Sequence, residues 1–237
     1  MIPERYARQQ AIVGEEAQRR LSQKKVLIVG CGGLGGHLIE NMLRIGVGSI
    51  LAADPDRFEA SNLNRQLLST VPLLGASKAE AAAARAKAVN PDTVFRAVAQ
   101  AFSAGNGDEL VSGCDLVLDG LDDIPARLAL EDVCGRQNVP IVHGAILGET
   151  VQVAVVPPRS GMLRTLYSGA APQARPADSI AYTPACCAAI QSAQALKLLL
   201  GHRPALWGKV LLLDMDTMTE EILPLSGIPA DPGSCTE

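Results

Sequence analysis

A glycine-rich segment, GCGGLG at residues 30–35, is the part of this sequence that most directly predicts chemistry. The apolar run VLIV precedes it and a helical pattern follows, which is the order of a nucleotide-binding βαβ unit. We expect Gly30 to permit a sharp turn, Gly32 to let the backbone approach a phosphate, and Gly35 to let the helix pack closely. The first-turn amides of that helix then face an anion. The segment predicts a nucleotide site, and such a turn most often binds a dinucleotide.

An acidic side chain follows at a spacing that suits the sugar of a nucleotide. Asp54 ends the apolar segment 49–54, about 20 residues after the glycines, where a carboxylate accepts hydrogen bonds from ribose hydroxyls. A solvated acid at a strand end is the alternative interpretation. The agreement between its position and the glycine turn favours the ribose role.

The loop SNLNRQ at residues 61–66 concentrates amides and a guanidinium just beyond that acid. Arg65 can clamp phosphate oxygens with two parallel hydrogen bonds, and Asn62 can bind them without charge. Lys78 stands at a predicted helix N-terminus, where a cation is unfavourable unless an anion is present. Ordinary surface charge explains Arg65 or Lys78 taken singly, but the combination predicts a phosphate-binding loop.

Two acids follow the predicted strand 116–119, in the segment LDGLDD. Asp119 and Asp122 come at the carboxyl end of that strand, the edge where open α/β sheets bind ligands. A carboxylate beside a triphosphate is repulsive unless Mg²⁺ lies between them, so Asp122, and with weaker support Asp119, is a candidate metal ligand. The alternative is a helix N-cap, which Asp122 or Asp123 could provide.

These residues need a scaffold of alternating strands and helices, and the apolar periodicity predicts one. Strands are expected at residues 25–30, 49–54, 94–100, 116–119, 140–145, 151–156, 210–214 and 218–223. Helices are expected at residues 15–21, 33–45, 77–89, 124–137 and 184–200. The parallel first half and the antiparallel second half predict a Rossmann-like α/β fold, with one mixed sheet and helices on both faces. Residues 1–225 form a single domain in this prediction, with a crossing loop at 157–183 and a loose tail at 226–237.

Composition restricts the class of protein. The 237 residues carry 21 basic and 25 acidic side chains in a mixed distribution, for a net charge of −4, so no basic stripe indicates nucleic acid. Apolar runs stay well below the ~20 residues that span a bilayer. The six cysteines lack CxxC spacing, and the charged N-terminus lacks a hydrophobic signal core. We expect a soluble cytoplasmic protein with reduced thiols and no membrane partner.

Taken together, the motifs closely resemble those of the MoeB/ThiF/HesA adenylyltransferases, which are relatives of ubiquitin-activating enzymes. In order along the chain they are YARQ at 6–9, the glycine segment, DPD at 54–56, SNLNRQ at 61–66, GASK at 75–78 and DGLD at 119–122. The resemblance covers roughly residues 4–224 and extends to Gln191 and Lys197 on the last predicted helix.

The resemblance implies ATP-dependent adenylation of a small ubiquitin-like sulfur-carrier protein at its C-terminal Gly-Gly carboxylate. That carboxylate attacks the α-phosphorus, pyrophosphate leaves, and an acyl-adenylate remains for sulfur transfer in cofactor biosynthesis. The molybdenum or tungsten cofactor, thiamin and other sulfur-containing products all stay open. The residues that the resemblance places around ATP are Gly30, Gly32, Gly33, Gly35, Asp54, Asp56, Asn62, Arg65, Gln66, Lys78, Leu121 and Asp122.

The same resemblance implies how the charge of the reaction is managed. Asp122 binds Mg²⁺, Asp54 holds the ribose, and Arg65 and Lys78 hold phosphates. Arg8 matches an arginine that relatives insert into the neighbouring subunit's site, which implies a homodimer with composite sites. A guanidinium there would neutralise the negative charge that gathers in the transition state. Without the resemblance, Arg8 would be interpreted as a solvent-facing helix charge.

The sequence departs from zinc-containing members of that family, which carry two CxxC pairs. Residues 161–167 read GMLRTLY and residues 232–237 read PGSCTE, so we expect no four-ligand zinc site. Residues 168–183 also lack the reactive cysteine that many relatives place in the crossing loop. Cys186 and Cys187 have apolar neighbours that favour packing over a thiol role, and His143 is interpreted as a neutral core histidine.

Three other functions stay open on the sequence alone. An NAD-dependent oxidoreductase would use the same glycine turn, but the second half shows no catalytic pair for hydride transfer, and Arg65 and Lys78 would have no task. A non-catalytic partner subunit would bind a carrier without adenylating it, although the nucleotide residues are all present. An enzyme that activates a tRNA base or a peptide would share the chemistry and differ in its acceptor.

Overall fold

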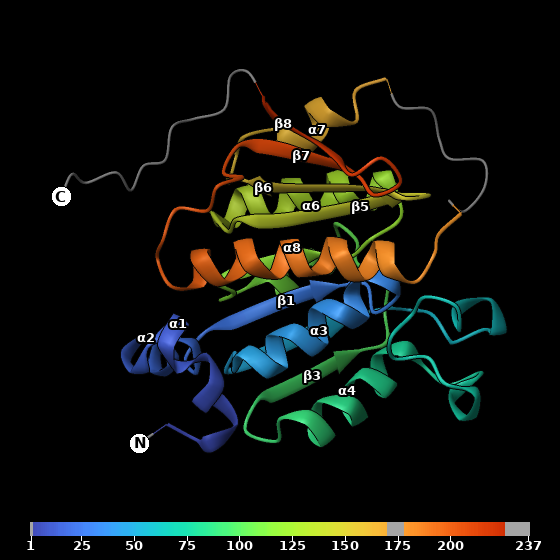
Figure 1. Ribbon diagram of the computed structural model, residues 1–237. Coiled ribbons are helices and arrows are strands. Elements are labelled where there is room, and N and C mark those ends of the chain that lie inside the picture. Colours follow the sequence, from blue (N-terminus) through green and yellow to red (C-terminus); the bar gives the residue numbers. More distant parts are fainter. Residues whose placement is uncertain (1, 170–177, 226–237) are drawn as a thin grey trace.

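The computed structural model describes residues 2–169 and 178–225; the expected tail at 226–237 lies outside this range. Within the described residues the strands form one eight-stranded sheet in the order β3-β2-β1-β4-β5-β6-β7-β8 (Figure 1). Strands β1 to β5 pair in parallel and β5 to β8 pair antiparallel, which confirms the predicted mixed sheet. The strands are β1 Lys25–Val29, β2 Ser49–Ala53, β3 Val94–Val98, β4 Leu116–Asp119, β5 Ile141–Leu147, β6 Thr150–Val156, β7 Lys209–Asp214 and β8 Thr219–Pro224.

Helices cover both faces of the sheet because strand residues alternate between two apolar clusters. Val26 and Ile28 belong to one cluster with residues of α3, α4 and α8, and Leu27 belongs to the other with residues of α5, α6 and α7. On the first face, α8 crosses the middle of the sheet above α3 and α4 (Figure 1). These helices are α3 Gly33–Ile45, α4 Lys78–Val89, α5 Gly107–Val111, α6 Ile124–Gln137, α7 Met162–Leu166 and α8 Tyr182–Leu199.

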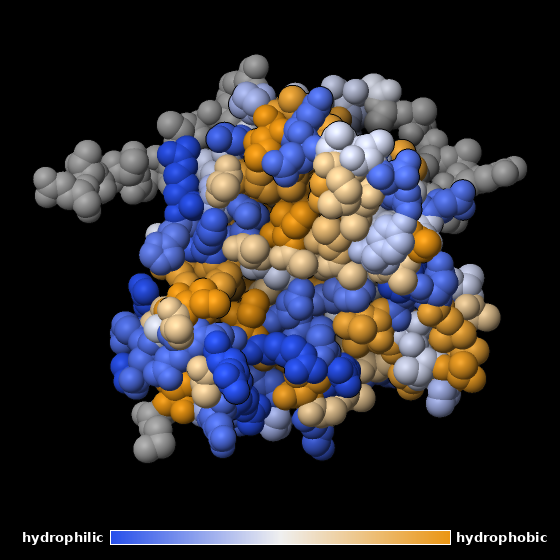
Figure 2. All heavy atoms as spheres, in the orientation of Figure 1, coloured by the Kyte–Doolittle hydropathy of each residue, from blue (hydrophilic) through white to orange (hydrophobic). Residues whose placement is uncertain are grey.

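Shorter helices occupy the N-terminus and the loop after β2. They are η1 Glu4–Gln9, α1 Gln10–Val13, α2 Glu15–Leu21, η2 Ala60–Asn62 and η3 Val71–Leu73. The loop of residues 56–75 forms a separate lobe at the edge of the molecule, and Figure 2 shows hydrophobic atoms gathered on it. In the described part of the chain, no helix is long and apolar enough to cross a membrane.

The strand order places a topological switch at β1. From β1 the chain passes through α3 to β2 on one side, whereas β4 pairs with β1 on the other side. The carboxyl ends of β1, β2 and β4 therefore lie side by side, with helices departing to opposite faces. In open α/β sheets this crevice is where ligands bind. The glycine segment follows β1 at this point.

The segment 157–183, expected to be a crossing loop, contains the short helix α7. Its anchor is Glu131, a buried acid on α6 whose carboxylate accepts hydrogen bonds from the backbone amides of Leu163 at 2.8 Å and Arg164 at 3.0 Å. A carboxylate at the amide end of a helix satisfies donors that otherwise lack partners. The helix thus depends on a contact with a residue some thirty positions away, which local periodicity does not reveal.

A second buried acid joins α3, which begins within the glycine segment, to α4. Glu40 of α3 accepts hydrogen bonds from Arg85 of α4 at 2.9 Å and from Arg44 at 2.7 Å. Burial alone would raise the pKa of Glu40, but the hydrogen bonds from the two arginines outweigh it and hold the pKa below its ordinary value of 4.5. The ionised carboxylate therefore stabilises the folded state.

We predict that Glu40→Gln lowers the free energy of unfolding at pH 7 by about 1–3 kcal/mol, since it weakens hydrogen bonds to charged groups. Because the pKa is lowered on folding, this stabilisation is present above pH 4.5 and is lost as the pH falls through the folded-state value. Urea unfolding of both proteins between pH 7 and pH 4 should therefore show the difference shrinking in acid. A difference that stays constant over this range would contradict the assignment.

Candidate active site

The glycine segment is the point where three elements meet through bare backbone. Gly30 has a φ of +91°, and a Cβ there would lie 2.6 Å from the carbonyl oxygen of Gly120, after β4. A Cβ at Gly35 would lie 1.7 Å from the carbonyl oxygen of Gly30. Both distances exclude a side chain, so the sharp turn and the close helix packing predicted for these two glycines are confirmed.

Gly32 leaves a polar cradle at the start of α3. It is the N-cap residue of that helix and supplies no side-chain cap, and a Cβ there would lie 3.5 Å from Nε2 of Gln66. Gln66 is buried, and its Oε1 has no hydrogen-bond partner among the described residues. A buried acceptor without a partner is costly, and a ligand that supplies a donor removes that cost. Helix amides and an unpartnered amide oxygen thus face the same small space.

Asp54 ties the glycine segment to the loop after β2. It is 5% exposed; its Oδ2 accepts a hydrogen bond from the amide of Cys31 at 2.6 Å, and its Oδ1 accepts one from the amide of Asp56 at 2.8 Å. A carboxylate offers about four acceptor positions, so both oxygens keep capacity for ribose hydroxyls. The structure adds a positioning role that the sequence did not indicate, because Asp54 fixes the turn itself.

Lys78 has an anionic partner within the chain. Its Nζ lies 2.9 Å from Oδ2 of Asp56, and its backbone amide donates to the carbonyl of Asp56. Lys78 is buried, whereas the side chain of Asp56 is 63% exposed. The carboxylate offsets the unfavourable placement of a cation at the first turn of α4. The ammonium is thereby held beside the glycine segment, paired with an acid that faces solvent.

Besides Gln66, the loop at residues 61–66 holds a second buried amide and a partly buried guanidinium. Asn62 is buried and its Oδ1 accepts a hydrogen bond from the amide of Glu59 at 3.0 Å. Nη1 of Arg65 donates to the carbonyl of Ser61 at 3.0 Å and to Oδ1 of Asn64 at 2.8 Å. Arg65 is thus held by its own loop through one nitrogen of its fork. Its proposed contact with phosphate stays a prediction.

The structure separates the three acids after β4. Asp123 is the N-cap of α6, and its carboxylate accepts a hydrogen bond from the amide of Ala126 at 2.9 Å. Asp119 is fully buried, with Oδ2 2.7 Å from Nδ1 of His143, so the weaker suggestion that it binds a metal does not fit. Asp122 is exposed, as Asp123 is, but it does not cap the helix.

The residues fit Mg²⁺ only together with a nucleotide. In the described ranges no group of three or more His, Cys, Asp or Glu side chains could hold a metal ion by itself. Mg²⁺ is commonly bound by one or two carboxylates, with phosphate oxygens and water completing its shell. The exposed carboxylate of Asp122, one residue beyond the peptide that packs on the glycine segment, matches that requirement.

A buried polar network surrounds Asp119, and sequence reasoning found only part of it. His143 is fully buried and burial lowers its pKa, which agrees with its interpretation as a neutral core histidine. Its Nε2 lies 3.0 Å from the hydroxyl of Tyr167 and 3.0 Å from Nε2 of Gln152. Arg127 of α6 completes the group. Register explains the central pair, since Asp119 and His143 are direct partners on β4 and β5.

Arg8 lies far from the glycine segment of its own chain. It lies in the last turn of η1, which packs through Tyr6 near Gly46, the C-cap of α3. The glycine segment is at the other end of α3, about 20 Å away for 13 helical residues. Figure 1 shows η1 and the start of α3 at opposite sides of the molecule. The exposed Arg8 therefore lies away from the site that the same chain builds.

The thiols near the site are poor nucleophiles. Burial raises the pKa of Cys31, Cys186 and Cys187, so the reactive thiolate is disfavoured at each. Sγ of Cys187 lies 3.6 Å from the carbonyl of Gln152 and 3.7 Å from that of Ala145, inside the contact between α8 and the sheet. These contacts support the packing role expected for Cys187.

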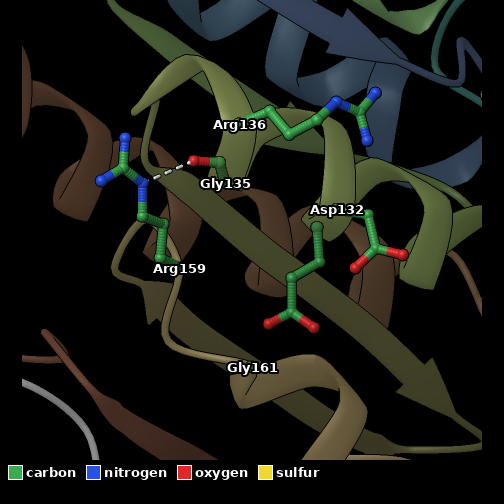
Figure 3. A pocket seen from close by; sticks show the side chains of 6 residues that line it. Asp132, Gly135, Arg136, Arg159 and Gly161 are labelled. Carbon is green, nitrogen blue, oxygen red and sulfur yellow. Dashed lines mark hydrogen bonds between the residues drawn. The ribbon is translucent and has the colours of Figure 1, made fainter.

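A surface pocket of about 370 Å³ lies elsewhere, between α6 and the turn before α7 (Figure 3). Its charged side chains already have partners: Asp132 pairs with Arg164, and Arg136 pairs with Asp108. Nε of Arg159 donates to the carbonyl of Gly135 at 3.1 Å, as Figure 3 shows. The glycine segment 30–35 does not line this pocket, so we place the candidate site at the switch point instead.

We predict that replacing each of two glycines of the same turn with alanine changes the free energy of unfolding by very different amounts. Gly35→Ala should reduce the free energy of unfolding by at least about 3 kcal/mol, because its Cβ would overlap a backbone carbonyl. Gly33→Ala should stay within about 1 kcal/mol of the parent protein, since its Cβ would lie 3.6 Å from Pro184, an ordinary contact. Urea unfolding followed by circular dichroism compares them. Equal midpoints would show that the close approach does not limit stability.

Comparison with known proteins identifies the family. The model of the ThiF family matches residues 6–232. The chain is 36% identical over 225 residues to the SAMP-activating enzyme E1 of Haloferax volcanii, covering 93% of this chain and 83% of that protein. It is 35% identical over 224 residues to the sulfur carrier protein adenylyltransferase of Thermus thermophilus, covering 89% and 83%. The maize adenylyltransferase and sulfurtransferase MOCS3-1 is 32% identical, and the chain spans about half of it.

Solved structures share the fold at lower identity. E. coli MccB with ATP has a TM-score of 0.79 at 21% identity, covering 98% of this chain and 74% of that one. The E. coli tRNA N6-threonylcarbamoyladenosine dehydratase TcdA has a TM-score of 0.71 at 22% identity, covering 84% and 95%. Such identities establish the arrangement of elements alone. With the family model and the named relatives, the conclusion is that this chain belongs to the ThiF family and is an adenylyltransferase of the ubiquitin-like activating type.

Proposed function

We propose that this protein uses ATP and Mg²⁺ to adenylate the C-terminal glycine carboxylate of a small ubiquitin-like sulfur-carrier protein. The observation that supports it most is the cradle at Gly32, where the amide end of α3 faces the unpartnered Oε1 of Gln66. The side chain of Asp54 binds the amide of Cys31 in that turn and the amide of Asp56, and Asp56 in turn pairs with Lys78. The two relatives above 34% identity are named for activating SAMP and a sulfur carrier.

In the proposed reaction the protein binds and orients groups without forming a bond to either reactant. An oxygen of the carrier's carboxylate attacks the α-phosphorus of ATP, the bond to the β-phosphate oxygen breaks, and pyrophosphate leaves with its electron pair. Asp54 and Gln66 hold the nucleoside, Arg65 and Lys78 neutralise phosphate oxygens, and Asn62 hydrogen-bonds to them without charge. Mg²⁺ held by Asp122 supplies further charge neutralisation when it is bound.

Lys78 is suited to this task by its existing ion pair. Asp56, largely exposed, holds the ammonium in place, and a triphosphate would present it with a stronger cluster of negative charge. The cation therefore needs no rearrangement before the nucleotide arrives. Preorganised charges of this kind avoid a reorganisation cost in the transition state.

We further propose a homodimer in which Arg8 acts in the partner's site. Arg8 is exposed and lies at the far end of α3 from its own glycine segment, so only a second copy can bring it to the phosphates. The lobe at residues 56–75 presents exposed apolar side chains next to the site, which suits a protein contact. Those side chains are Leu63, Leu67, Val71 and Leu74.

No structural zinc belongs to the proposal. The positions where zinc-containing relatives carry the first CxxC pair fall on α7, which Glu131 anchors instead. Adenylation of a tRNA base or a peptide is the second candidate, supported by the fold shared with TcdA and MccB. The names of the relatives above 30% identity favour the carrier, and none supports the NAD-dependent oxidoreductase.

Mass spectrometry of candidate carriers tests the function. After incubation with ATP and Mg²⁺, a carrier ending in Gly-Gly should gain one AMP at its C-terminus, and pyrophosphate should appear in equal amount. Arg65→Ala should lower kcat/KM by about a hundredfold because it removes charge at the phosphates. Arg57→Ala is the matched control, since Arg57 is an exposed arginine of the same lobe whose Nη1 donates to the carbonyl of Gly75.

AMP found on an RNA or a peptide and on no carrier would replace the proposed acceptor with the second candidate. Equal activity of Arg65→Ala and Arg57→Ala would remove Arg65 from the phosphate site. Both variants should retain the unfolding midpoint of the parent, so that a loss of activity is not a loss of fold.

Mixing two inactive variants tests the composite site. Arg8→Ala and Asp122→Ala should each abolish exchange between ATP and pyrophosphate. In a 1:1 mixture allowed to exchange subunits, half of the dimers carry one intact site, so about one quarter of the parent activity should return. A mixture that stays inactive, although light scattering shows mixed dimers, would mean that Arg8 serves the site of its own chain or none.

A further inference from the structure

Leu121, the residue that precedes Asp122, is held at both of its backbone polar atoms. The amide of Leu121 donates to Oδ1 of Asp119 at 2.9 Å, and the carbonyl of Leu121 accepts a hydrogen bond from Nη2 of Arg127. Asp119 at the end of β4 and Arg127 on α6 therefore both hydrogen-bond to Leu121, in the loop that joins the two elements. Asp122 is the next residue, and its carboxylate faces solvent.

Asp119 and Arg127, the two residues that hold Leu121, form a buried ion pair. Nε of Arg127 lies 3.7 Å from Oδ2 of Asp119, and their side chains are 8% and 0% exposed. That distance allows attraction but no hydrogen bond, so this nitrogen has no hydrogen-bond partner in the described chain. Burying two charges carries a desolvation cost that their attraction repays only in good geometry. This buried pair fixes the loop, although apolar residues at the same two positions could give the folded protein more stability.

A hydrogen-bonded chain of uncharged side chains holds the Asp119–Arg127 ion pair in place. Burial lowers the pKa of His143 and raises that of Tyr167, so the imidazole is neutral and the phenol keeps its proton. Nδ1 of His143 then donates to Asp119 at 2.7 Å, and its Nε2 accepts from Tyr167 or Gln152, each at 3.0 Å. Nη1 of Arg127 donates to the hydroxyl of Tyr167 at 3.1 Å, so the chain of hydrogen bonds that starts at Asp119 ends at Arg127.

The segment of residues 120–121 also contacts the glycine segment. The carbonyl oxygen of Gly120 lies where a Cβ on Gly30 would be 2.6 Å away, and the amide of Gly120 donates to the carbonyl of Val29 at 2.9 Å. Movement of residues 120 and 121 would therefore press on the glycine segment. The loop can present Asp122 in one orientation only while Asp119 and Arg127 hold it.

We propose that Asp119 and Arg127 are positioning residues that set the Leu121–Asp122 segment, and so aim the carboxylate of Asp122 at the Mg²⁺ of the bound nucleotide. This inference rests on the proposed function. Neither residue touches the metal or the phosphates; they act through Leu121. Partners behind a metal ligand of this kind commonly alter metal affinity by about 10–100-fold when they are removed.

Calorimetry of ATP binding with and without Mg²⁺ tests the role in the full-length protein. Asp119→Asn and Arg127→Lys should lose most of the Mg²⁺-dependent increase in ATP affinity, by about tenfold or more, and keep the affinity measured in EDTA. In the exchange reaction the same variants should need more Mg²⁺ for half-maximal rate. A structural role alone would lower both affinities together.

Glu40→Gln is the matched control, because Glu40 is also a buried carboxylate paired with arginine but lies away from the loop. It should lower stability and leave the Mg²⁺-dependent increase intact. If Asp119→Asn behaves like Glu40→Gln, the positioning role is wrong.

Asp122→Asn separates this inference from the proposed function. Loss of the increase in Asp122→Asn, with retention in Asp119→Asn, would refute the positioning role alone. Retention in Asp122→Asn itself would remove Asp122 from the metal site and the positioning role with it. Absence of ATP binding by the unsubstituted protein would refute the proposed function.

Discussion

Contact between backbone and backbone, with no side chain between, is the constraint on which this site depends. Gly30, Gly35 and Gly120 come from the turn after β1, the first turn of α3 and the loop after β4. A Cβ on Gly30 or Gly35 would overlap backbone atoms, and one on Gly120 would lie 3.1 Å from backbone atoms of Gly35 and Val29. Their approach brings the amide end of α3 against the ends of two strands. Asp54 then fastens the turn from the side of β2. The polar groups of the site converge because the glycines leave room for the elements that carry them.

Two ion pairs border this contact and differ in what they permit. The acid of the Lys78–Asp56 pair is 63% exposed, so an incoming phosphate can compete for the ammonium at small cost. Both members of the Asp119–Arg127 pair are buried, and breaking it would leave an uncompensated charge in the interior. The first pair is therefore suited to exchange partners during binding, and the second is suited to stay fixed. A phosphate site needs both behaviours, one for the ligand and one for the loop that faces it.

Local periodicity predicted the elements well, and long-range contacts explain what it missed. The strand at 116–119 and the helices at 33–45 and 124–137 have the predicted bounds, and the strand predicted at 49–54 is found at 49–53, because alternation and caps lie within each segment. The helix α7 depends on Glu131, far away in sequence, and the network around Asp119 depends on the pairing of β4 with β5. The misplaced metal role of Asp119 has the same cause, since the sequence does not show that His143 would lie opposite it.

The anchoring of α7 links the far face of the sheet to the site. Residues 162–166 form a helix because Glu131 accepts its first amides, and Met162 and Leu163 bury their side chains in the cluster beneath it. The chain that leaves this helix carries Tyr167, whose hydroxyl meets His143, Gln152 and Arg127. A carboxylate on α6 thus fixes the element that supplies the outer member of the network around Asp119. The order of α7 therefore brings the hydroxyl of Tyr167 to the polar network behind the carboxyl end of β4.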